Sequence, residues 1–592
     1  MKSITEVLNS KVSEAFEKAG FDGSFGRVNI SNRPDLCEYQ CNGAMALAKA
    51  MHKKPIDIAE AVVGNLKESD CFKKAEAVMP GFINLDISEG FVASYLTEMA
   101  ADENMGLSSV EEKNGAKPLI IVDYGGANVA KPLHVGHLRS AVIGESIKRL
   151  GAAMGNRMIG DVHLGDWGLQ MGLIIEELKD RNQTEFDLSD LEEIYPAASA
   201  KSKEKDENGE LTERALEFKE RALAATEKLQ SGDSECMAIW KRIMELSIPD
   251  LKRNYDSLNV SFDLWKGESD VQKYIPDMLK DLEERGIAYE SQGALVVDIS
   301  EEGDTKELPP CIVRKSDGAS LYATTDLATL IEREKLYSPD AYIYIADQRQ
   351  SLHYTSFFRV ARKAGIVRED EGLTFLGFGT MNGKDGKPFK TREGGVLRLS
   401  ALVNEINEKV YEKIRENRSE EDISDEEARE ISKTVGLAAL KYGDLSNQAS
   451  KDYIFDIDRF TSFEGNTGPY ILYSMVRISS IMKKYCEQGN ELPKGCVSTE
   501  AVAESKASKD LALLLTRYNE VMELAWRELA PHKICQYIYE ISNAFNSFYH
   551  ETKILSEENE AKKRAYISLL SLTRDVLTKC TDVLGFEAPE RM

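Results

Sequence analysis

The sequence has no hydrophobic run of membrane-spanning length, and its start, MKSITEVLNS, lacks the apolar block of a signal peptide. Its nine cysteines form no CxxC unit, and the one close pair, Cys37 and Cys41, has no histidine cluster beside it. These absences predict reduced thiols, a cytoplasmic location, no membrane partner and no structural zinc. We assign no residue of the chain to a metal ion.

Several familiar catalytic and ion-binding patterns are also missing, namely HExxH, the EF-hand loop and the phosphate-binding GxxxxGK[ST]. No serine or cysteine nucleophile stands in a pattern with a histidine base. A reaction without a covalent enzyme intermediate is therefore favoured.

Basic residues are in the minority, because 75 lysines and arginines stand against 100 aspartates and glutamates, for a net charge of −25. This balance argues against a protein that coats nucleic acid nonspecifically, but it leaves room for a local basic surface. With 592 residues, 42% of them hydrophobic, the chain is long enough for several domains with packed cores.

The order of predicted elements indicates an α/β protein with four regions. Residues 1–112 read as a small α/β domain, with helices at 1–18 and 43–53 and a strand at 81–86. Residues 113–400 read as a doubly wound parallel sheet, interrupted by a charged helical insertion at about 180–290. A helical connecting region, 401–460, and an all-α domain, 461–592, follow, and we expect no strand after residue 400. The expected sheet strands are 118–122, 157–161, 341–346 and 374–379.

The segment after the first sheet strand carries the strongest chemical signal. His134 and His137 flank Gly136 where a helix over 138–150 is expected to begin. Helix N-termini attract anions, imidazole N–H groups donate to phosphate oxygens, and glycine permits close approach. Two histidines that merely lie beside a turn glycine are the alternative. With seven histidines in the whole chain, we favour a phosphate site.

A loop after the last expected strand, residues 382–395, is rich in glycine and carries the cations Lys384, Lys387, Lys390 and Arg392. Its glycines would let it fold over a polyphosphate, and its cations would offset charge on a pyrophosphate leaving group. A solvated hairpin is the alternative interpretation.

Four polar residues are expected to converge at the carboxyl ends of the strands. Asp123 ends the first strand, Tyr322 and Asp326 share one face of a probable helix, and Gln350 follows the strand at 341–346. Together they suit a cationic, planar, hydrogen-bonding side chain. Taken singly, each acid could instead be a helix cap or a surface residue.

With these residues in view, the chain resembles the class I aminoacyl-tRNA synthetases, and among them the bacterial-type arginyl-tRNA synthetases. His134-Val135-Gly136-His137 matches the HIGH motif of the class, and the resemblance runs from the N-terminal region to the last residue. Four segments are similar to the arginyl members of the class. They are Asn128-x-x-Lys131-x-x-His134-x-Gly136-His137-x-Arg139-Ser140, Gly165-Asp166-Trp167-Gly168, Gly465-Asn466-Thr467-Gly468-Pro469-Tyr470 and Glu587-Ala588-Pro589-Glu590-Arg591-Met592.

The resemblance implies a Rossmann-type catalytic domain that activates L-arginine with ATP and Mg²⁺. Arginyl-adenylate forms, pyrophosphate leaves, and the arginyl group passes to the terminal adenosine of tRNA(Arg) with release of AMP. It further implies a monomer whose N-terminal domain grips the outer corner of the tRNA and whose C-terminal domain binds the anticodon. Activation is implied to wait for bound tRNA.

The family pattern also implies roles for individual residues. Asn128 and Gln350 would hold the amino and carboxylate ends of arginine, with Gln348 as the rival to Gln350. The implied readers of the guanidinium are Asp123, Tyr322 and Asp326, the implied ATP ligands are His134, Gly136, His137, Lys384 and Lys387, and the implied tRNA contacts are Tyr470 and Met592.

The chain departs from the pattern of the class in two places. The sequence Lys387-Pro388-Phe389-Lys390-Thr391-Arg392 stands where most class I enzymes carry KMSKS. Lys131, Lys390 or Arg392 would then supply the charge of the missing second lysine. Asp123 stands where glutamate is often expected, and Gly125-Gly126 where serines are common, which could loosen the arginine pocket or be offset by a backbone shift.

Two other hypotheses remain open at this point. One is a different enzyme of the same fold, either another class I synthetase or a nucleotidylyltransferase, although the terminal domains disfavour the transferase. The other is a catalytically silent tRNA-binding paralogue, which the intact histidines and loop cations disfavour.

Overall fold

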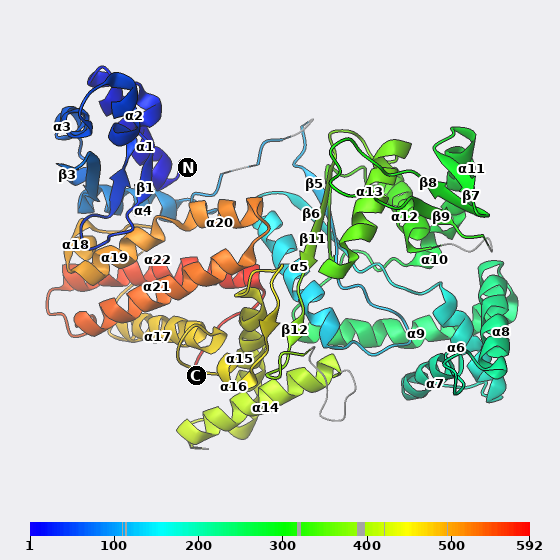
Figure 1. Cartoon of the computed structure of the whole chain (residues 1–592). Coiled ribbons are helices and arrows are strands. Elements are labelled where there is room, and N and C mark those ends of the chain that lie inside the picture. Colours follow the sequence, from blue (N-terminus) through cyan, green and yellow to red (C-terminus); the bar gives the residue numbers. More distant parts are fainter. Residues whose placement is uncertain (109, 113–114, 317–320, 388–396, 420, 494) are drawn as a thin grey trace. The chain divides into compact units, whose positions relative to one another are not determined.

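The computed structural model describes residues 1–108, 110–112, 115–316, 321–387, 397–419, 421–493 and 495–592. The chain divides into two compact units (Figure 1). One unit comprises Met1–Ser109, Ser462–Asp582 and Glu587–Met592, and the other Val110–Thr461 and Val583–Phe586. The predicted terminal domains thus share one unit, and the predicted catalytic and connecting regions share the other.

The N-terminal module is built around an antiparallel sheet in the order β1-β2-β4-β3. Its strands are β1 (Val28–Ile30), β2 (Tyr39–Cys41), β3 (Phe72–Val78) and β4 (Phe82–Ile87), and its helices are α1 (Ile4–Lys18), η1 (Gly23–Phe25), α2 (Gly43–Met51), α3 (Pro55–Leu66) and α4 (Glu89–Ala101). Ser3 and Glu6 form a capping box that fixes the start of α1. Both predicted helices and the predicted strand of this module are confirmed, while α3 was not predicted.

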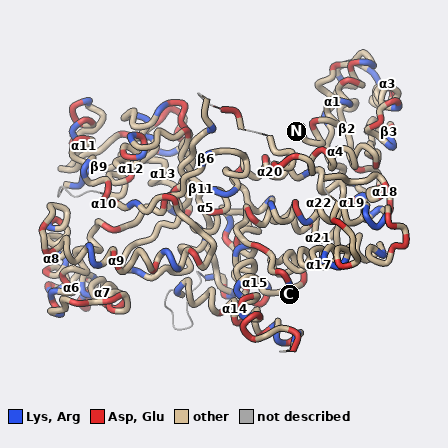
Figure 2. Tube along the Cα trace, turned by 180° about the vertical axis from the view of Figure 1, so that it is seen from behind, with Lys and Arg blue, Asp and Glu red and all other residues tan. Residues whose placement is uncertain are grey.

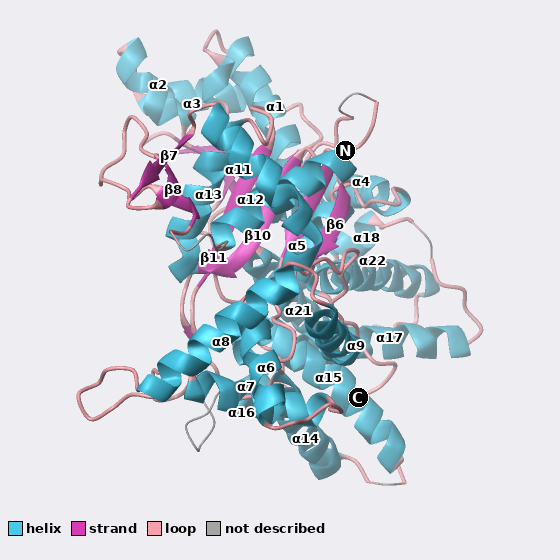
Figure 3. Ribbon diagram, turned by 90° about the vertical axis from the view of Figure 1, so that its right-hand side faces the viewer, coloured by secondary structure: helices cyan, strands magenta, loops and turns pink. Residues whose placement is uncertain are grey.

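The catalytic unit is centred on a parallel sheet in the order β11-β10-β5-β6, and all four predicted strands are confirmed. The strands are β5 (Leu119–Asp123), β6 (Arg157–Asp161), β10 (Ala341–Asp347) and β11 (Gly372–Phe378). Their apolar side chains are almost continuous, because a parallel sheet is covered by helices on its faces. Figure 3 shows α5 (Val135–Ala153) and α12 (Tyr322–Leu336) lying along these strands.

Between the two halves of this sheet the chain forms the predicted helical insertion. Its elements are α6 (Leu169–Asp180), α7 (Leu188–Lys201), α8 (Glu213–Gln230), α9 (Ser234–Ser257), α10 (Glu268–Val271), η2 (Gln272–Tyr274) and α11 (Ile275–Glu284). A small antiparallel sheet of β7 (Ala288–Ser291), β8 (Ala294–Val297) and β9 (Cys311–Arg314) follows and was not predicted. The second half of the main sheet adds η3 (Gln348–Gln350) and α13 (Ser351–Ala364).

Our expectation of no strand after residue 400 is wrong at one place. Tyr453–Ile454 forms β13, which pairs in parallel with β12, Met381–Asn382. Two residues carry no alternation that a sequence pattern can detect, so this strand is defined only by its partner.

The remaining elements are helical. They are α14 (Leu399–Asn417), α15 (Asp425–Leu445), α16 (Ile457–Phe460), α17 (Gly468–Glu487), α18 (Thr499–Ala503), α19 (Lys506–Leu515), α20 (Tyr518–Arg527), α21 (Pro531–Glu551) and α22 (Glu560–Leu584). None of the helices in the described ranges has the length and apolarity needed to span a bilayer. Acidic and basic residues are interspersed along the chain in both units (Figure 2), so the net charge of −25 is not confined to one block.

Candidate active site

The first helix of the parallel-sheet unit begins at the predicted histidine pair. His134 is the N-cap of α5, and its Nδ1 accepts the backbone N–H of Gly136 at 3.0 Å. The Nδ1 of His137 accepts the backbone N–H of His134 at 3.2 Å. The two ring centroids lie 4.0 Å apart. Because each Nδ1 accepts a hydrogen bond, the proton of each neutral ring is on Nε2, where it can be donated to a ligand.

Both imidazoles are held in the neutral form at pH 7. Burial lowers the pKa of His137 to about 3, and the neighbouring His134 and Lys131 act in the same direction. Burial and Lys131 also lower the pKa of His134. A neutral imidazole keeps one N–H group, so each of the two rings at this helix N-terminus can donate one hydrogen bond to a phosphate oxygen.

Glycine is required at two positions of this turn. A Cβ at Gly136 would lie 2.7 Å from the His134 ring, so a larger residue would displace the imidazole. Gly125 has φ +94°, which other residues rarely adopt, and its N–H donates to the Ser140 hydroxyl at 2.9 Å. The glycines at 125 and 126 therefore permit a left-handed backbone course where the family pattern led us to expect serines.

Asp123 ends β5, as predicted, but its carboxylate already has a guanidinium partner inside the protein. Arg333 of α12 donates to Asp123 at 2.6 Å and to Asp161 of β6 at 2.7 Å. Burial raises the pKa of Asp123, and the positive charge of Arg333 opposes that shift. One of the Asp123 oxygens is thus engaged in holding α12 to the sheet.

Asp326, one turn after Tyr322 on α12, accepts a hydrogen bond of 2.6 Å from Nε2 of His353 on α13. Burial raises the pKa of the Tyr344 and Tyr354 phenols, and the charges of Asp123 and Asp326 add to that shift. Arg333, which binds Asp123, follows Asp326 by two turns on α12, so both acids lie where this helix meets the sheet. The structure therefore brings the two predicted acids together.

A third acid, Glu268, was missed by the sequence analysis. It begins α10, and burial raises its pKa to about 7, with Asp166 and Asp326 contributing in the same direction and His163 opposing them. Glu268 also acts on the phenol of Tyr322. It follows Asp123 by 145 positions and lies in no periodic segment, so no spacing in the sequence marks it.

His163 was also missed and lies among the same acids. Burial raises the pKa of Asp123, Asp166 and Glu268, and His163 acts in the opposite direction on all three carboxyls. Within the described residues, neither of its buried ring nitrogens has a hydrogen-bond partner. Its backbone has φ +39°, an unusual value for a residue other than glycine. A strained residue with free polar atoms in an acidic pocket is typical of a ligand site.

The structure does not show the other predicted arginine ligands in contact with these acids. The Tyr322 side chain is 74% exposed, and burial and the nearby Glu268, Tyr195 and Asp326 raise its pKa. Asn128 pairs through its backbone with Gly165 at the turn after β5. Gln348 and Gln350 are both exposed in η3, so the choice between them stays open.

The cation-rich loop is described only in its first part. The Lys384 ammonium is paired with Asp456 at 3.1 Å and with Asp458 at 3.6 Å. Lys387 is exposed at a turn closed by the Gly383 N–H and the Lys387 carbonyl. Lys390 and Arg392 lie outside the described residues.

Comparison with known proteins identifies the family. The model "tRNA synthetases class I (R), catalytic domain" matches residues 101–457, "Arginyl tRNA synthetase N terminal domain" matches 2–87 and "DALR anticodon binding domain" matches 471–592. The Arginine--tRNA ligases of Agathobacter rectalis and Alkaliphilus oremlandii are 55% and 48% identical over the whole of both chains. The chain belongs to the class I arginyl-tRNA synthetase family.

Solved structures agree with this membership in the class I arginyl-tRNA synthetase family. The arginyl-tRNA synthetase of Plasmodium falciparum superposes with a TM-score of 0.80 at 25% identity, with full coverage of both chains. The arginyl-tRNA synthetase of Thermus thermophilus has a TM-score of 0.78 at 20% identity, again over both whole chains, which shows a shared fold.

The other unit of this arginyl-tRNA synthetase family member carries an aromatic and cationic surface on α17 and α21. The Tyr470 hydroxyl donates to Asn543 at 2.6 Å and accepts from Asn546 at 2.9 Å. Arg477 lies between the rings of Tyr473 and Tyr549, at 4.5 and 5.0 Å from their centroids. Met592 belongs to the same unit.

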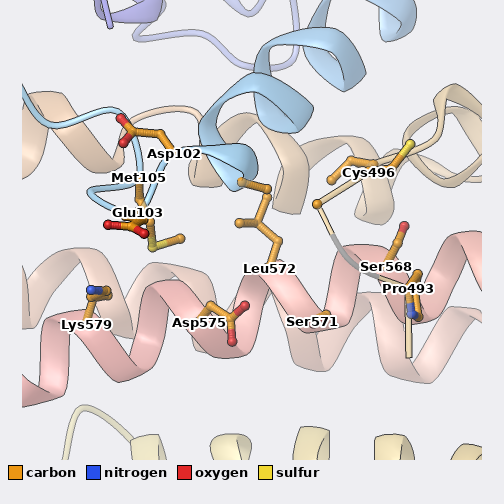
Figure 4. A pocket seen from close by; sticks show the side chains of 13 residues that line it. Asp102, Glu103, Met105, Pro493, Cys496, Ser568, Ser571, Leu572, Asp575 and Lys579 are labelled. Atoms are coloured by element: carbon orange, nitrogen blue, oxygen red, sulfur yellow. The ribbon is translucent and has the colours of Figure 1, made fainter. Parts of the chain in front are cut away.

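A cavity of about 230 Å³ in that unit is separate from the predicted catalytic residues, none of which lines it. Figure 4 shows Asp102, Glu103 and Met105 facing Asp575 and Lys579 of α22 across it. In the described part of the chain, no group of three or more histidine, cysteine or acidic side chains is arranged to hold a metal ion.

Proposed function

We propose that the chain ligates L-arginine to tRNA(Arg) in an ATP-dependent, two-step reaction. The observation that carries this proposal is that Asp123 and Asp326 both lie where α12 meets the parallel sheet, and that Glu268 begins α10, which packs against α12. A guanidinium is the one amino-acid side chain that is planar, always charged and able to donate to several carboxylates at once. The relatives named Arginine--tRNA ligase support the same substrate.

In the first step, a carboxylate oxygen of arginine attacks the α-phosphorus of ATP, and the bond from that phosphorus to the bridging oxygen of pyrophosphate breaks. Nε2–H groups of His134 and His137 donate to phosphate oxygens, and the Lys131 ammonium offsets the charge that develops on them. Lys390 and Arg392 are the rival cations. Asn128 and Gln350, or Gln348 in its place, hold the two ends of the amino-acid backbone.

In the second step, the 2′-hydroxyl of the terminal adenosine attacks the carbonyl carbon of arginyl-adenylate, and AMP leaves. The protein contributes mainly position and charge, because neither step needs a covalent bond to a side chain. Mg²⁺ bound to the phosphates of ATP would supply positive charge that lowers the repulsion between the attacking carboxylate and the phosphates. The neutral imidazoles suit this arrangement, since they bind phosphate oxygens and leave others for the metal.

The tRNA would be bound in part by the surface around Tyr470, Tyr473 and Arg477. Exposed tyrosines and a guanidinium offer flat faces on which unpaired bases can stack. Met592 is a further contact in this proposal, and the N-terminal module, residues 1–112, takes the outer corner of the tRNA. A monomeric, cytoplasmic enzyme remains our prediction.

The proposal is tested by charging a purified tRNA pool with each of the twenty amino acids in turn. Arginine alone should be esterified, and only in the presence of ATP and Mg²⁺. Preferential charging of another amino acid would indicate a different synthetase. Binding of tRNA without any charging would indicate a catalytically silent paralogue.

A further inference from the structure

Tyr195, on helix α7 of the insertion, contacts a residue of the phosphate site although no sequence motif marks it. The Lys131 ammonium lies over its ring, 4.2 Å from the ring centroid. An ammonium at that distance is attracted to the negative face of the ring. The insertion thus reaches the one lysine that stands directly before the histidine motif.

Other interactions of Lys131 also place its side chain near the two histidines of the phosphate site. The charge of Lys131 lowers the pKa of both His134 and His137, so its ammonium lies near their imidazoles. The preceding residue, Ala130, has φ +60°, and its N–H donates to the Ser247 hydroxyl of α9 at 2.9 Å. The backbone before Lys131 is thus held by α9, and the Tyr195 ring of α7 contacts the tip of the Lys131 side chain.

Helix α7 is also tied to the segment that follows the cation-rich loop. Glu192, one turn before Tyr195, pairs with Arg398 at 2.7 Å. The backbone of 397–399 in turn bonds to the HxGH segment, because Val135 N–H donates to Leu397 and Leu399 N–H donates to Leu133. The helix that carries Tyr195 is therefore fixed against both chain segments that border the phosphate site.

We propose that Tyr195 is a positioning residue for the adenylation step, and that its ring face holds the Lys131 ammonium where it meets the triphosphate. This inference rests on the role of Lys131 in the proposed function. A free lysine side chain samples many rotamers, so a ring that selects one of them makes the charge available when it is needed. The pair of Glu192 and Arg398 ties the helix that carries the ring to the segment after the loop.

The Tyr195 hydroxyl has a different neighbour from its ring. The phenol of Tyr195 acts electrostatically on that of Tyr322, which borders the arginine pocket. Replacement by phenylalanine removes the hydroxyl and keeps the ring, whereas replacement by leucine removes both. The two variants therefore separate an effect on Lys131 from an effect on arginine binding.

The test is a double-mutant cycle in the full-length enzyme with ATP, arginine and tRNA(Arg). We expect Tyr195→Leu to lower the rate of the first turnover about tenfold, with a much smaller change in the KM for ATP. Tyr195→Phe should keep most of that rate. In a Lys131→Ala background, Tyr195→Leu should cause no further loss, because the group that it positions is absent. Glu193→Ala, an exposed change on the same helix, is the matched control.

Loss of folding would appear equally in both backgrounds, so the cycle distinguishes it from loss of positioning. An equal loss from Tyr195→Leu with and without Lys131, or a full rate in Tyr195→Leu itself, would overturn the inference while leaving the proposed function intact. A Lys131→Ala enzyme with the wild-type rate would overturn the assigned role of Lys131, and the inference with it.

Discussion

At the scale of single residues, the pocket depends on acids whose partners inside the protein are incomplete. One oxygen of Asp326 accepts a hydrogen bond from His353, and burial, with the nearby Asp166 and Asp326, raises the pKa of the half-buried Glu268 carboxyl to about 7. A cationic ligand stabilises the ionised form of a carboxyl most when that carboxyl has few partners within the protein. The guanidinium of the substrate therefore supplies the positive charge that these carboxyls lack in the folded chain.

Replacing Asp326 with asparagine should lower kcat/KM for arginine by about 100-fold, since a charged acceptor for the guanidinium becomes a neutral amide. Steady-state charging with arginine as the varied substrate measures this effect. Asp304→Asn, which disturbs an acid paired with Arg359, is the control and should leave the value near wild type. An unchanged KM and kcat in Asp326→Asn would contradict the assigned role.

The raised pKa of Glu268 predicts a pH dependence of arginine binding. The guanidinium keeps its charge at every pH concerned, and it pairs with the ionised form of the carboxyl. The KM for arginine should therefore fall as the pH rises through about 7 and level off above it, with a difference of about tenfold between pH 6 and pH 8.

Glu268→Gln should raise the KM for arginine throughout and flatten this profile. His163, Asp166 and Asp326 act on the same carboxyl, so His163→Gln is a useful companion that should shift the profile without abolishing it. A Glu268→Gln enzyme that keeps the wild-type pH dependence would remove Glu268 from the guanidinium site.

At the scale of elements, Arg333 holds α12 to the parallel sheet through two buried acids, Asp123 on β5 and Asp161 on β6. Arg333→Met would leave both acids without their guanidinium partner, and a lost buried partner of an ion pair costs roughly 3–5 kcal/mol in folding free energy. Urea unfolding followed by tryptophan fluorescence measures the loss, because Trp167, Trp240 and Trp265 lie in this unit.

The matched control for that change is Arg349→Met. Its side chain is 82% exposed and pairs with Asp347, so its loss should cost no more than about 1 kcal/mol. Equal stability of Arg333→Met and the wild type would show that the Asp123–Arg333–Asp161 group does not anchor the helix.

The same elements show what the sequence could reveal. Buried parallel strands such as β5 and β10 are continuous apolar runs, and the HxGH segment begins the helix that comes after β5, so both were predictable. The strand β13 was not, since two residues have no periodicity. Glu268 and Tyr195 reach the site through tertiary folding of the insertion, and nothing in their local sequence distinguishes them from surface residues of a charged helical region.

At the scale of the whole molecule, catalysis and the aromatic surface around Tyr470 belong to different units of the chain. The family resemblance predicts that the catalytic unit activates arginine only after tRNA has bound. Exchange of labelled pyrophosphate into ATP should therefore be negligible with arginine alone and substantial once tRNA(Arg) is added. Rapid exchange without tRNA would refute the coupling without affecting the assignment of the substrate.

The most direct test of the central claim, that the clustered acids read a guanidinium, compares arginine with citrulline, its neutral counterpart of similar shape. In charging of tRNA(Arg), we predict that kcat/KM for citrulline is lower by about 10⁴-fold, because half-buried acids lose their charged partner. The gap should narrow in Asp326→Asn. Charging of citrulline within tenfold of arginine would contradict the account.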